Sequence, residues 1–147
     1  MTAPFVQPED DTAAAAIAEI GEELALFDDW MQRYQYIIEL GRKLPAFPPQ
    51  WQDDAHRVPG CQSQVWMEVQ PRGDRLYLAG ASDAAIVSGR VALLLRVYSG
   101  RSRQEILDTD PQFLRDLGLV QALSTNRGNG VEAMAQAIRK AAALPAP

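Results

Sequence analysis

The chain has 147 residues, of which 47% are hydrophobic, enough for one domain with an ordinary core. Its 19 acidic and 14 basic residues give a net charge of −5 and no basic cluster, which argues against a duplex nucleic-acid binder. Its most apolar stretch, residues 84–97, is too short to span a bilayer, and residues 1–11 do not resemble a secretory signal. With one unpaired cysteine, these features lead us to expect a soluble protein of the reducing cytoplasm.

The N-terminal residues carry two prolines and then a helical pattern. Pro4 and Pro8 predict a flexible tail over residues 1–10, followed by a single domain over residues 11–143. From Asp11 onward, apolar residues recur at helical spacing. These residues are Ile17, Ile20, Leu24 and Phe27. They predict a first amphipathic helix.

A second helix is predicted after Asp28 and Asp29, two acids suited to a helix N-terminus. Its predicted buried stripe consists of Trp30, Tyr34, Ile37, Ile38 and Gly41. Such an aromatic stripe is typical of a core face rather than of a ligand site. Three prolines within residues 45–49 end this helix and predict an irregular connection.

The middle of the chain predicts a β-hairpin and a long helix. Residues 65–70 alternate between apolar and larger or polar side chains, as a strand does, and residues 75–81 form the returning strand. The turn residues 71–74 predict a four-residue connection between them. Ser82 is expected to cap a central, buried helix from Asp83 to about Tyr98.

The last third of the chain is predicted to be helical. Residues 102–105 form a capping-box pattern, and Asp110 precedes a proline at a helix start. The last helix has an apolar stripe of Val131, Met134, Ala135, Ile138 and Ala142. The predicted fold class is therefore α+β, a small antiparallel β-sheet packed by helices.

Cys61, the only cysteine, follows a Pro-Gly turn signal and precedes the first strand. A single cysteine can neither close a disulfide within the chain nor build a thiolate metal cage. Two interpretations remain open at this point. The residue is either a small buried hydrophobe or a thiol on a loop that does sulfur chemistry with a partner protein.

Other candidate sites are weaker. His56, the only histidine, could form a thiolate–imidazolium pair with Cys61, but a solvated loop histidine is the simpler interpretation. Arg127 could lower the pKa of a nearby thiol, or it could be an ordinary surface arginine. The sequence contains no Walker phosphate loop and no dinucleotide fingerprint, and the glycines at 128 and 130 indicate a capping turn. We expect no metal site.

Four motifs carry a resemblance to a known family. They are Tyr36-Ile37-Ile38-Glu39-Leu40-Gly41, Pro59-Gly60-Cys61-Gln62-Ser63-Gln64-Val65-Trp66, Ser82-Asp83-Ala84-Ala85-Ile86-Val87-Ser88-Gly89 and Asn126-Arg127-Gly128-Asn129-Gly130-Val131-Glu132-Ala133-Met134. In this order, from about residue 27 to residue 142, the chain resembles the SufE/CsdE family of sulfur-acceptor proteins. The run around the cysteine is highly specific. The alanine-rich N-terminal extension and Ala81 depart from the family pattern.

The resemblance implies a fold shared with the U-type (NifU-like) iron–sulfur scaffolds. It also implies a carrier that receives persulfide sulfur on Cys61 from a cysteine desulfurase, stimulates that enzyme and passes the sulfur to a scaffold or another acceptor. No cofactor of its own is implied, since pyridoxal phosphate (PLP) belongs to the desulfurase, and no cluster is expected on one cysteine. The free chain is expected to be a monomer or weak homodimer.

The same resemblance assigns site residues. It implies Arg127 as a stabiliser of the thiolate or persulfide, close to Cys61 in the fold. Residues expected to take part in binding are Gly60, Gln62, Ser63, Gln64 and Asp83. Because transfer needs reach while storage needs protection, we expect a shielded Cys61 sulfur and an outward movement of residues 59–64. Val58 and Trp66 are expected to supply apolar shielding.

Two alternatives stay open. The chain could be a cysteine-dependent enzyme, a thiol hydrolase or peroxide reductase, with His56 as the base. It could also be a regulatory module that binds a desulfurase while Cys61 stays inert.

Overall fold

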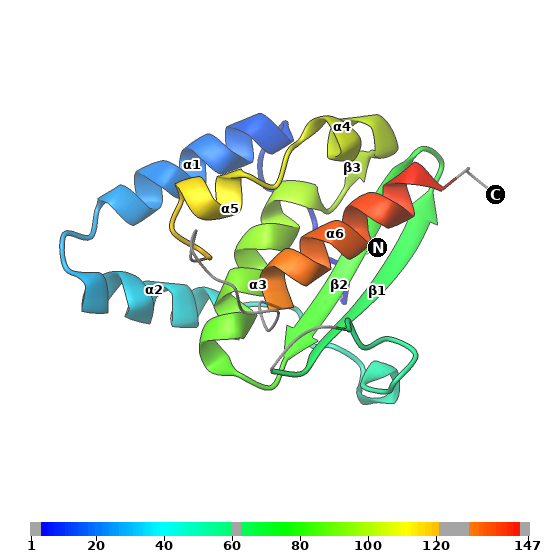
Figure 1. Cartoon of the computed structure of the whole chain (residues 1–147), viewed down its shortest axis with the longest axis horizontal. Coiled ribbons are helices and arrows are strands. Elements are labelled where there is room, and N and C mark those ends of the chain that lie inside the picture. The colour runs from blue at the N-terminus through cyan, green and yellow to red at the C-terminus, as the bar shows by residue number, and fades with distance from the viewer. Residues whose placement is uncertain (1–3, 60–62, 121–129, 145–147) are drawn as a thin grey trace.

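The computed structural model describes residues 4–59, 63–120 and 130–144. The elements are, in chain order, α1 (Ala13–Ala25), α2 (Trp30–Arg42), the 3-10 helix η1 (Pro49–Trp51), β1 (Val65–Arg72), β2 (Arg75–Ser82), α3 (Ala85–Tyr98), β3 (Arg101–Ser102), α4 (Arg103–Asp108), α5 (Phe113–Asp116) and α6 (Gly130–Ala143) (Figure 1). Within the described ranges, no helix has the length and apolar character needed to cross a membrane.

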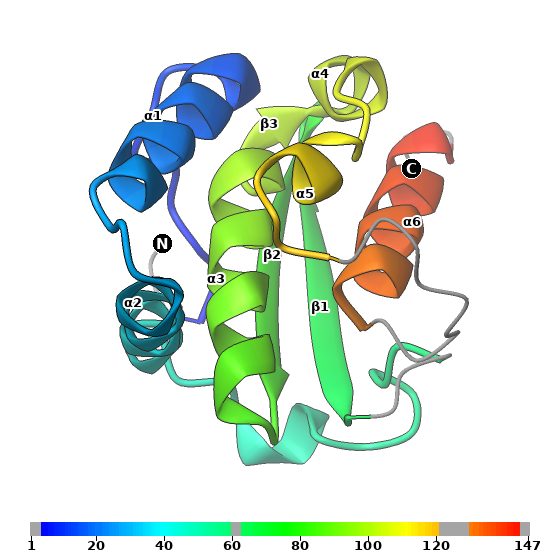
Figure 2. The ribbon, with the colours of Figure 1, turned by 60° about the vertical axis from the view of Figure 1, so that its left-hand side comes forward.

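The sheet is antiparallel, with β2 between β1 and the short β3. Helices α3 and α6 lie against one face of this sheet, and α1 and α2 pack on the far side of α3 (Figures 1 and 2). A Cβ on Gly80 of β2 would lie 2.8 Å from the Met134 methyl of α6 and 3.0 Å from a Val91 methyl of α3. The predicted α+β class, a small antiparallel sheet packed by helices, is confirmed.

Helix α3 is the centre of the core, as its all-round apolar pattern predicts. Its buried residues are Gly89, Val91, Leu93, Leu94, Leu95, Val97 and Tyr98. It meets α2 backbone to backbone, since a Cβ on Gly89 would collide with the carbonyl oxygen of Ile37. A Cβ on Gly41 would likewise lie 2.6 Å from the Gly89 nitrogen. The α2–α3 crossing therefore requires glycine on both helices.

The hairpin between β1 and β2 is tighter than predicted. Arg72 pairs with Arg75, so only two residues form the loop, and the expected four-residue connection is wrong. Pro71 lies within β1 rather than in the turn. Proline is tolerated there because β1 is an edge strand, in which the missing N–H of proline need not cost a hydrogen bond of the sheet. Gly73 opens the loop with φ of 60°, a conformation that suits glycine in two-residue hairpins.

Residues 4–10 form a strap along the sheet rather than a flexible tail. The Val6 N–H donates to the Leu78 carbonyl at 2.9 Å, and the Asp10 carboxylate pairs with Arg96 at 3.0 Å. The expected tail over residues 1–10 is therefore corrected for the part that the structure describes. The two prolines exclude a helix there, but they do not prevent an extended segment from pairing with the exposed backbone of β2.

The aromatic stripe of α2 is only partly a core face. Ile37 is buried, but the Trp30 side chain is 68% exposed, so its predicted place in the core is wrong. The close approach to α3 is at Ile37 and Gly41, about two helical turns or more from Trp30. Trp30 instead stacks on Tyr34, with ring centroids 5.2 Å apart.

The predictions for α4 and α6 hold, but the predicted start of the helix between them is wrong, because α5 begins at Phe113 after the N-cap residue Gln112 and not at Pro111 after Asp110. Ser102 Oγ accepts from the Glu105 N–H at 3.1 Å and caps α4 as the sequence pattern predicts. The Glu105 carboxylate departs from the capping box, because it accepts from the Ala13 N–H of α1 at 2.7 Å. All five residues of the predicted α6 stripe are buried.

Candidate functional site

Four of the site residues that the sequence singles out lie outside the described ranges. They are Gly60, Cys61, Gln62 and Arg127. The shielding of the sulfur, the movement of residues 59–64 and the closeness of Arg127 to Cys61 therefore stay predictions. The residues on either side of Cys61 are described, and they define the frame that holds it.

A short antiparallel ladder closes the segment that contains Cys61. Two backbone hydrogen bonds form this ladder, from the Val58 N–H to the Val65 carbonyl at 2.8 Å and from the Met67 N–H to the His56 carbonyl at 2.9 Å. Residues 56–58 and 65–67 are termed the stem below. The stem leaves six residues, 59–64, between its two sides, and Cys61 is near their middle.

Both sides of the stem are fixed by burial. Val58 and Val65 are 4% and 0% exposed and belong to the main core. Trp66 is 8% exposed and packs into a second cluster with Phe5 and Phe47, on the sheet face opposite α3 and α6. Val58 and Trp66, the expected apolar shield, are thus both buried at the stem, in separate clusters.

A reciprocal pair of hydrogen bonds between Gln64 and Asp83, termed the clamp below, lies at the C-terminal end of the cysteine segment. The Gln64 N–H donates to Asp83 Oδ1 at 3.1 Å, and the Asp83 N–H donates back to the Gln64 carbonyl at 3.2 Å. The sequence placed Asp83 in the first turn of the long helix, but α3 begins at Ala85, after the N-cap residue Ala84. The Ser82 hydroxyl accepts from the Ala84 N–H at 3.2 Å instead of capping a helix that starts at Asp83. The early part of the predicted helix is therefore wrong, and Asp83 ties the cysteine segment to the start of α3.

His56 is held between two carboxylates beside the stem. Its Nδ1 lies 2.7 Å from Asp53 Oδ1, its Nε2 lies 3.5 Å from Glu68 Oε2, and its ring stacks on Trp51. The hydrogen bond to Asp53 raises the pKa of His56, and it lowers the pKa of Asp53 in turn. The i,i+3 spacing of Asp53 and His56 is the only sequence signal of this pair, and our sequence analysis missed it.

This arrangement does not favour His56 as a catalytic base. Both ring nitrogens face carboxylate oxygens, Asp53 at Nδ1 and Glu68 at Nε2, so no described contact directs either nitrogen at the cysteine segment. Glu68 Oε1 also accepts from the Val69 N–H at 3.0 Å, so the carboxylate links the histidine to the free edge of β1. The described contacts of His56 are those of a structural residue beside the stem.

A cavity of about 520 Å³ between the strap and helices α1–α3 lies apart from the stem. Arg96 is its most buried charge, and it pairs with both Asp10 and Glu23 at 3.0 Å. Tyr36 donates to Glu23 at 2.6 Å, and burial together with this bond raises the pKa of Tyr36 to about 12. Arg96 and Tyr36 are thus already paired within the protein, which does not single the cavity out as a reactive site.

The described residues hold no group of three or more histidine, cysteine, aspartate or glutamate side chains placed to bind a metal ion. Of the expected binding residues in these ranges, Ser63 is partly exposed and Gln64 and Asp83 are exposed. The structure thus brings Gln64 and Asp83 together at one end of the stem and places His56 at the other, opposite Met67.

Comparison with known proteins identifies the family of the chain. The family model described as SufE, Fe-S metabolism associated domain, matches residues 18–142. An uncharacterized SufE-like protein of Rhizobium etli is 38% identical over 137 residues, covering 90% of this chain and 93% of that protein. An uncharacterized SufE-like protein of Rhizobium meliloti is 38% identical over 132 residues, covering 86% and 94%.

The fold has also been observed before. The solution structure of a hypothetical protein from Thermus thermophilus matches with a TM-score of 0.68 over 86% of this chain and 93% of the other, at 23% identity. Such a likeness supports the fold alone, whereas the family match extends over most of the sequence. The chain belongs to the SufE family of Fe-S metabolism associated domains.

Proposed function

We propose that the protein is a sulfur carrier for iron–sulfur cluster assembly, with Cys61 as the residue that receives the sulfur. The observation that carries this proposal is the frame around Cys61, a six-residue segment closed by the stem and by the Gln64–Asp83 clamp. The stem and the clamp lie where β1 begins and β2 ends, and the single cysteine lies between them in the sequence. The donor is a cysteine desulfurase, which holds the PLP, and the acceptor is a scaffold or another sulfur-accepting protein.

The transfer step needs only one thiolate on this chain. The Cys61 thiolate attacks the outer sulfur of the desulfurase persulfide, and a new sulfur–sulfur bond forms as the old one breaks. The desulfurase cysteine leaves as a thiolate, so no outside oxidant or reductant is needed. Emptying the desulfurase in this way stimulates its turnover. In this proposal Arg127 stabilises the negative sulfur, and Gly60, Gln62, Ser63, Gln64 and Asp83 take part in binding.

The test is to load the protein with sulfur. The chain is mixed with its cysteine desulfurase, PLP and cysteine, and intact-mass spectrometry is expected to find one added sulfur atom on Cys61. Cys61→Ser should take up none and should no longer stimulate the desulfurase. If the serine variant still stimulates, Cys61 is inert and the chain acts only as a binding module.

A second variant separates the carrier from the enzyme alternative. A thiol hydrolase or peroxide reductase with His56 as base would lose its activity in His56→Gln. A carrier should keep sulfur uptake in this variant, because the described contacts of His56 are with Asp53, Glu68 and Trp51.

A further inference from the structure

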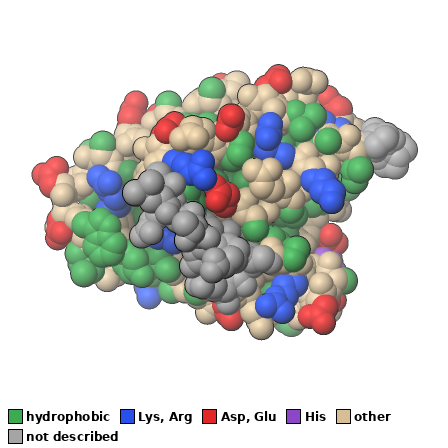
Figure 3. All heavy atoms as spheres, viewed as in Figure 1, with side chains coloured by type: hydrophobic (Ala, Val, Ile, Leu, Met, Phe, Trp, Pro, Cys, Tyr) green, Lys and Arg blue, Asp and Glu red, His purple; other side chains and the backbone are tan. Residues whose placement is uncertain are grey.

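The corner where α1 meets α2 exposes large apolar side chains. Leu26, Trp30 and Met31 are 79%, 68% and 53% exposed. Within the described residues, the only other large apolar side chain so exposed is Leu144, at the end of α6. Figure 3 shows hydrophobic side chains gathered at the α2 end of the molecule, beside lysine or arginine side chains. A clustered exposed patch of this kind marks an interaction site more often than scattered single residues do.

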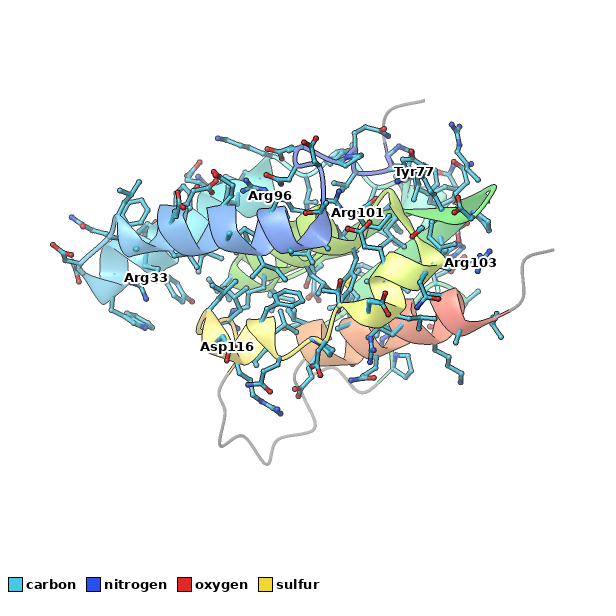
Figure 4. The ribbon with its side chains drawn as sticks, turned by 90° about the horizontal axis from the view of Figure 1, so that it is seen from above. Arg33, Tyr77, Arg96, Arg101, Arg103 and Asp116 are labelled. Atoms are coloured by element: carbon cyan, nitrogen blue, oxygen red, sulfur yellow. The ribbon has the colours of Figure 1, made fainter. Side chains whose placement is uncertain are left out.

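Two arginines next to this patch have no carboxylate partner in the described part of the chain. Arg33 follows Trp30 by one helical turn, and its Nη2 donates only to the Phe27 carbonyl at 3.2 Å. Figure 4 shows Arg33 at the end of the molecule formed by α1 and α2. Arg90 on α3 is half-buried, and the Nε atoms of both arginines are buried without a hydrogen-bond partner. Arg42, Arg96 and Arg115 form ion pairs with carboxylates in the described ranges, whereas Arg33 and Arg90 do not. The other two described arginines with a buried, unpartnered Nε, Arg103 and Arg139, lie on α4 and α6, away from α2.

Arg90 and the aromatic pair belong to one surface. Helices α2 and α3 meet at Ile37 and Gly89, so Arg90 lies at this crossing, and Tyr34 is one turn before Ile37. Burial lowers the pKa of Arg90, and nearby Tyr34 opposes this effect. Trp30 then stacks on Tyr34. The residues Trp30, Arg33, Tyr34 and Arg90 are termed the aromatic–arginine surface.

This surface extends toward the cysteine segment. Asp83, which clamps Gln64, directly precedes the N-cap of α3, and Arg90 lies roughly 9 Å further along that helix at 1.5 Å per residue. A standard protein interface covers about 800 Å² on each partner, or roughly 30 Å across. One partner that engages the cysteine segment is therefore large enough to cover Arg90 and Tyr34 as well.

We propose that the aromatic–arginine surface is the docking surface for the cysteine desulfurase, an inference that rests on the proposed function. The composition fits, because tryptophan, tyrosine and arginine dominate the energetics of protein interfaces. The charge specifies the partner's chemistry, since two desolvated guanidinium groups without carboxylates favour a segment that presents acidic side chains beside an apolar one. Docking there would hold the desulfurase while the cysteine segment exchanges sulfur.

The experiment measures binding separately from transfer. Isothermal titration calorimetry uses the purified PLP-containing desulfurase and the chain in a Cys61→Ser background, so no sulfur moves. Trp30→Ala should raise the Kd about tenfold or more, and Arg90→Gln about fivefold with a weaker dependence on salt. Leu144→Ala and Arg42→Gln are the matched controls, one exposed apolar and one exposed arginine residue, and each should change the Kd by less than about twofold.

Each outcome decides the matter. Equal affinity of Trp30→Ala, Arg90→Gln and the unaltered surface, or no binding at all, overturns the docking proposal. Light scattering that shows a dimer dissociated by Trp30→Ala also overturns it, because the occupant is then a second copy of the chain. Weakened binding without sulfur uptake by wild-type Cys61 leaves the docking surface standing and removes the carrier role. Normal sulfur uptake by Cys61, with desulfurase binding unaltered in Trp30→Ala and Arg90→Gln, removes the docking surface and leaves the carrier role standing.

Discussion

The stem and the aromatic–arginine surface differ in how far their residues are buried and paired within the molecule. The stem is held by backbone hydrogen bonds and by Val58 and Val65, which are almost fully buried. The aromatic–arginine surface leaves Trp30 in solvent and Arg90 without a carboxylate among the described residues. The contrast indicates that the two regions do different work. A reactive residue benefits from a fixed frame, whereas a docking surface benefits from side chains that find their partners only on binding.

The largest effect should come from the reactive residue within the frame. Cys61→Ser is expected to abolish sulfur uptake and desulfurase stimulation, while its free energy of unfolding changes by less than about 1 kcal/mol. Urea denaturation and intact-mass spectrometry measure the two quantities on the same preparation. A large loss of stability would identify Cys61 as a packing residue and would count against its role as a carrier.

The second prediction breaks the connection between the two regions at the α2–α3 crossing. Gly89→Ala should destabilise the fold by about 3 kcal/mol, because the new methyl group would collide with the Ile37 carbonyl. Gly21→Ala in α1 is the matched control, since its Cβ would make an ordinary 3.5 Å contact with Leu117. That substitution should be neutral or stabilise by up to about 1 kcal/mol. Equal effects of the two variants in thermal denaturation would refute the close crossing.

The accuracy of the sequence predictions follows from how local the determining contacts are. The α6 stripe and the Ser102 cap depend on neighbours within one or two helical turns, and both were predicted correctly. The exposure of Trp30 depends on where α3 stops covering α2, which no periodicity within α2 reveals. The strap depends on unpaired backbone groups of β2 that lie about 70 residues away in sequence.

The same distinction holds within the candidate site. The motif around Cys61 identified the family, but the clamp from Gln64 to Asp83 joins residues 19 apart. Helix propensity places Asp83 at the α3 N-terminus, whereas the tertiary contact recruits its carboxylate for the cysteine segment. For His56, the partner Glu68 depends on strand register, which the sequence alone did not provide.

A third prediction loosens the frame without touching the sulfur. Asp83→Ala removes the acceptor of the Gln64 N–H, at a cost of about 1 kcal/mol or less because Gln64 is exposed. Amide hydrogen exchange at Gln64 should speed up, and Cys61 should react several-fold faster with a bulky thiol reagent. Asp83→Asn keeps an acceptor oxygen at this position and should behave nearly as wild type. Unchanged labelling in the alanine variant would show that this clamp does not control access to Cys61.

The smallest effect should be the pH dependence of the His56–Asp53 pair beside the stem. Because the folded pKa of His56 is raised, its contribution to stability is complete below the unfolded value of roughly 6.5 and is lost as pH rises through the folded pKa. The pKa of Asp53 is lowered, so its contribution is present above roughly pH 4 and is lost as pH falls through the folded value. The pair therefore stabilises the fold most between these limits, and only slightly, because both partners reach solvent. Denaturation of wild type and His56→Gln at pH 6 and pH 9 should show a smaller pH difference in the variant, and an equal difference in both would mean that the pair contributes nothing to the frame.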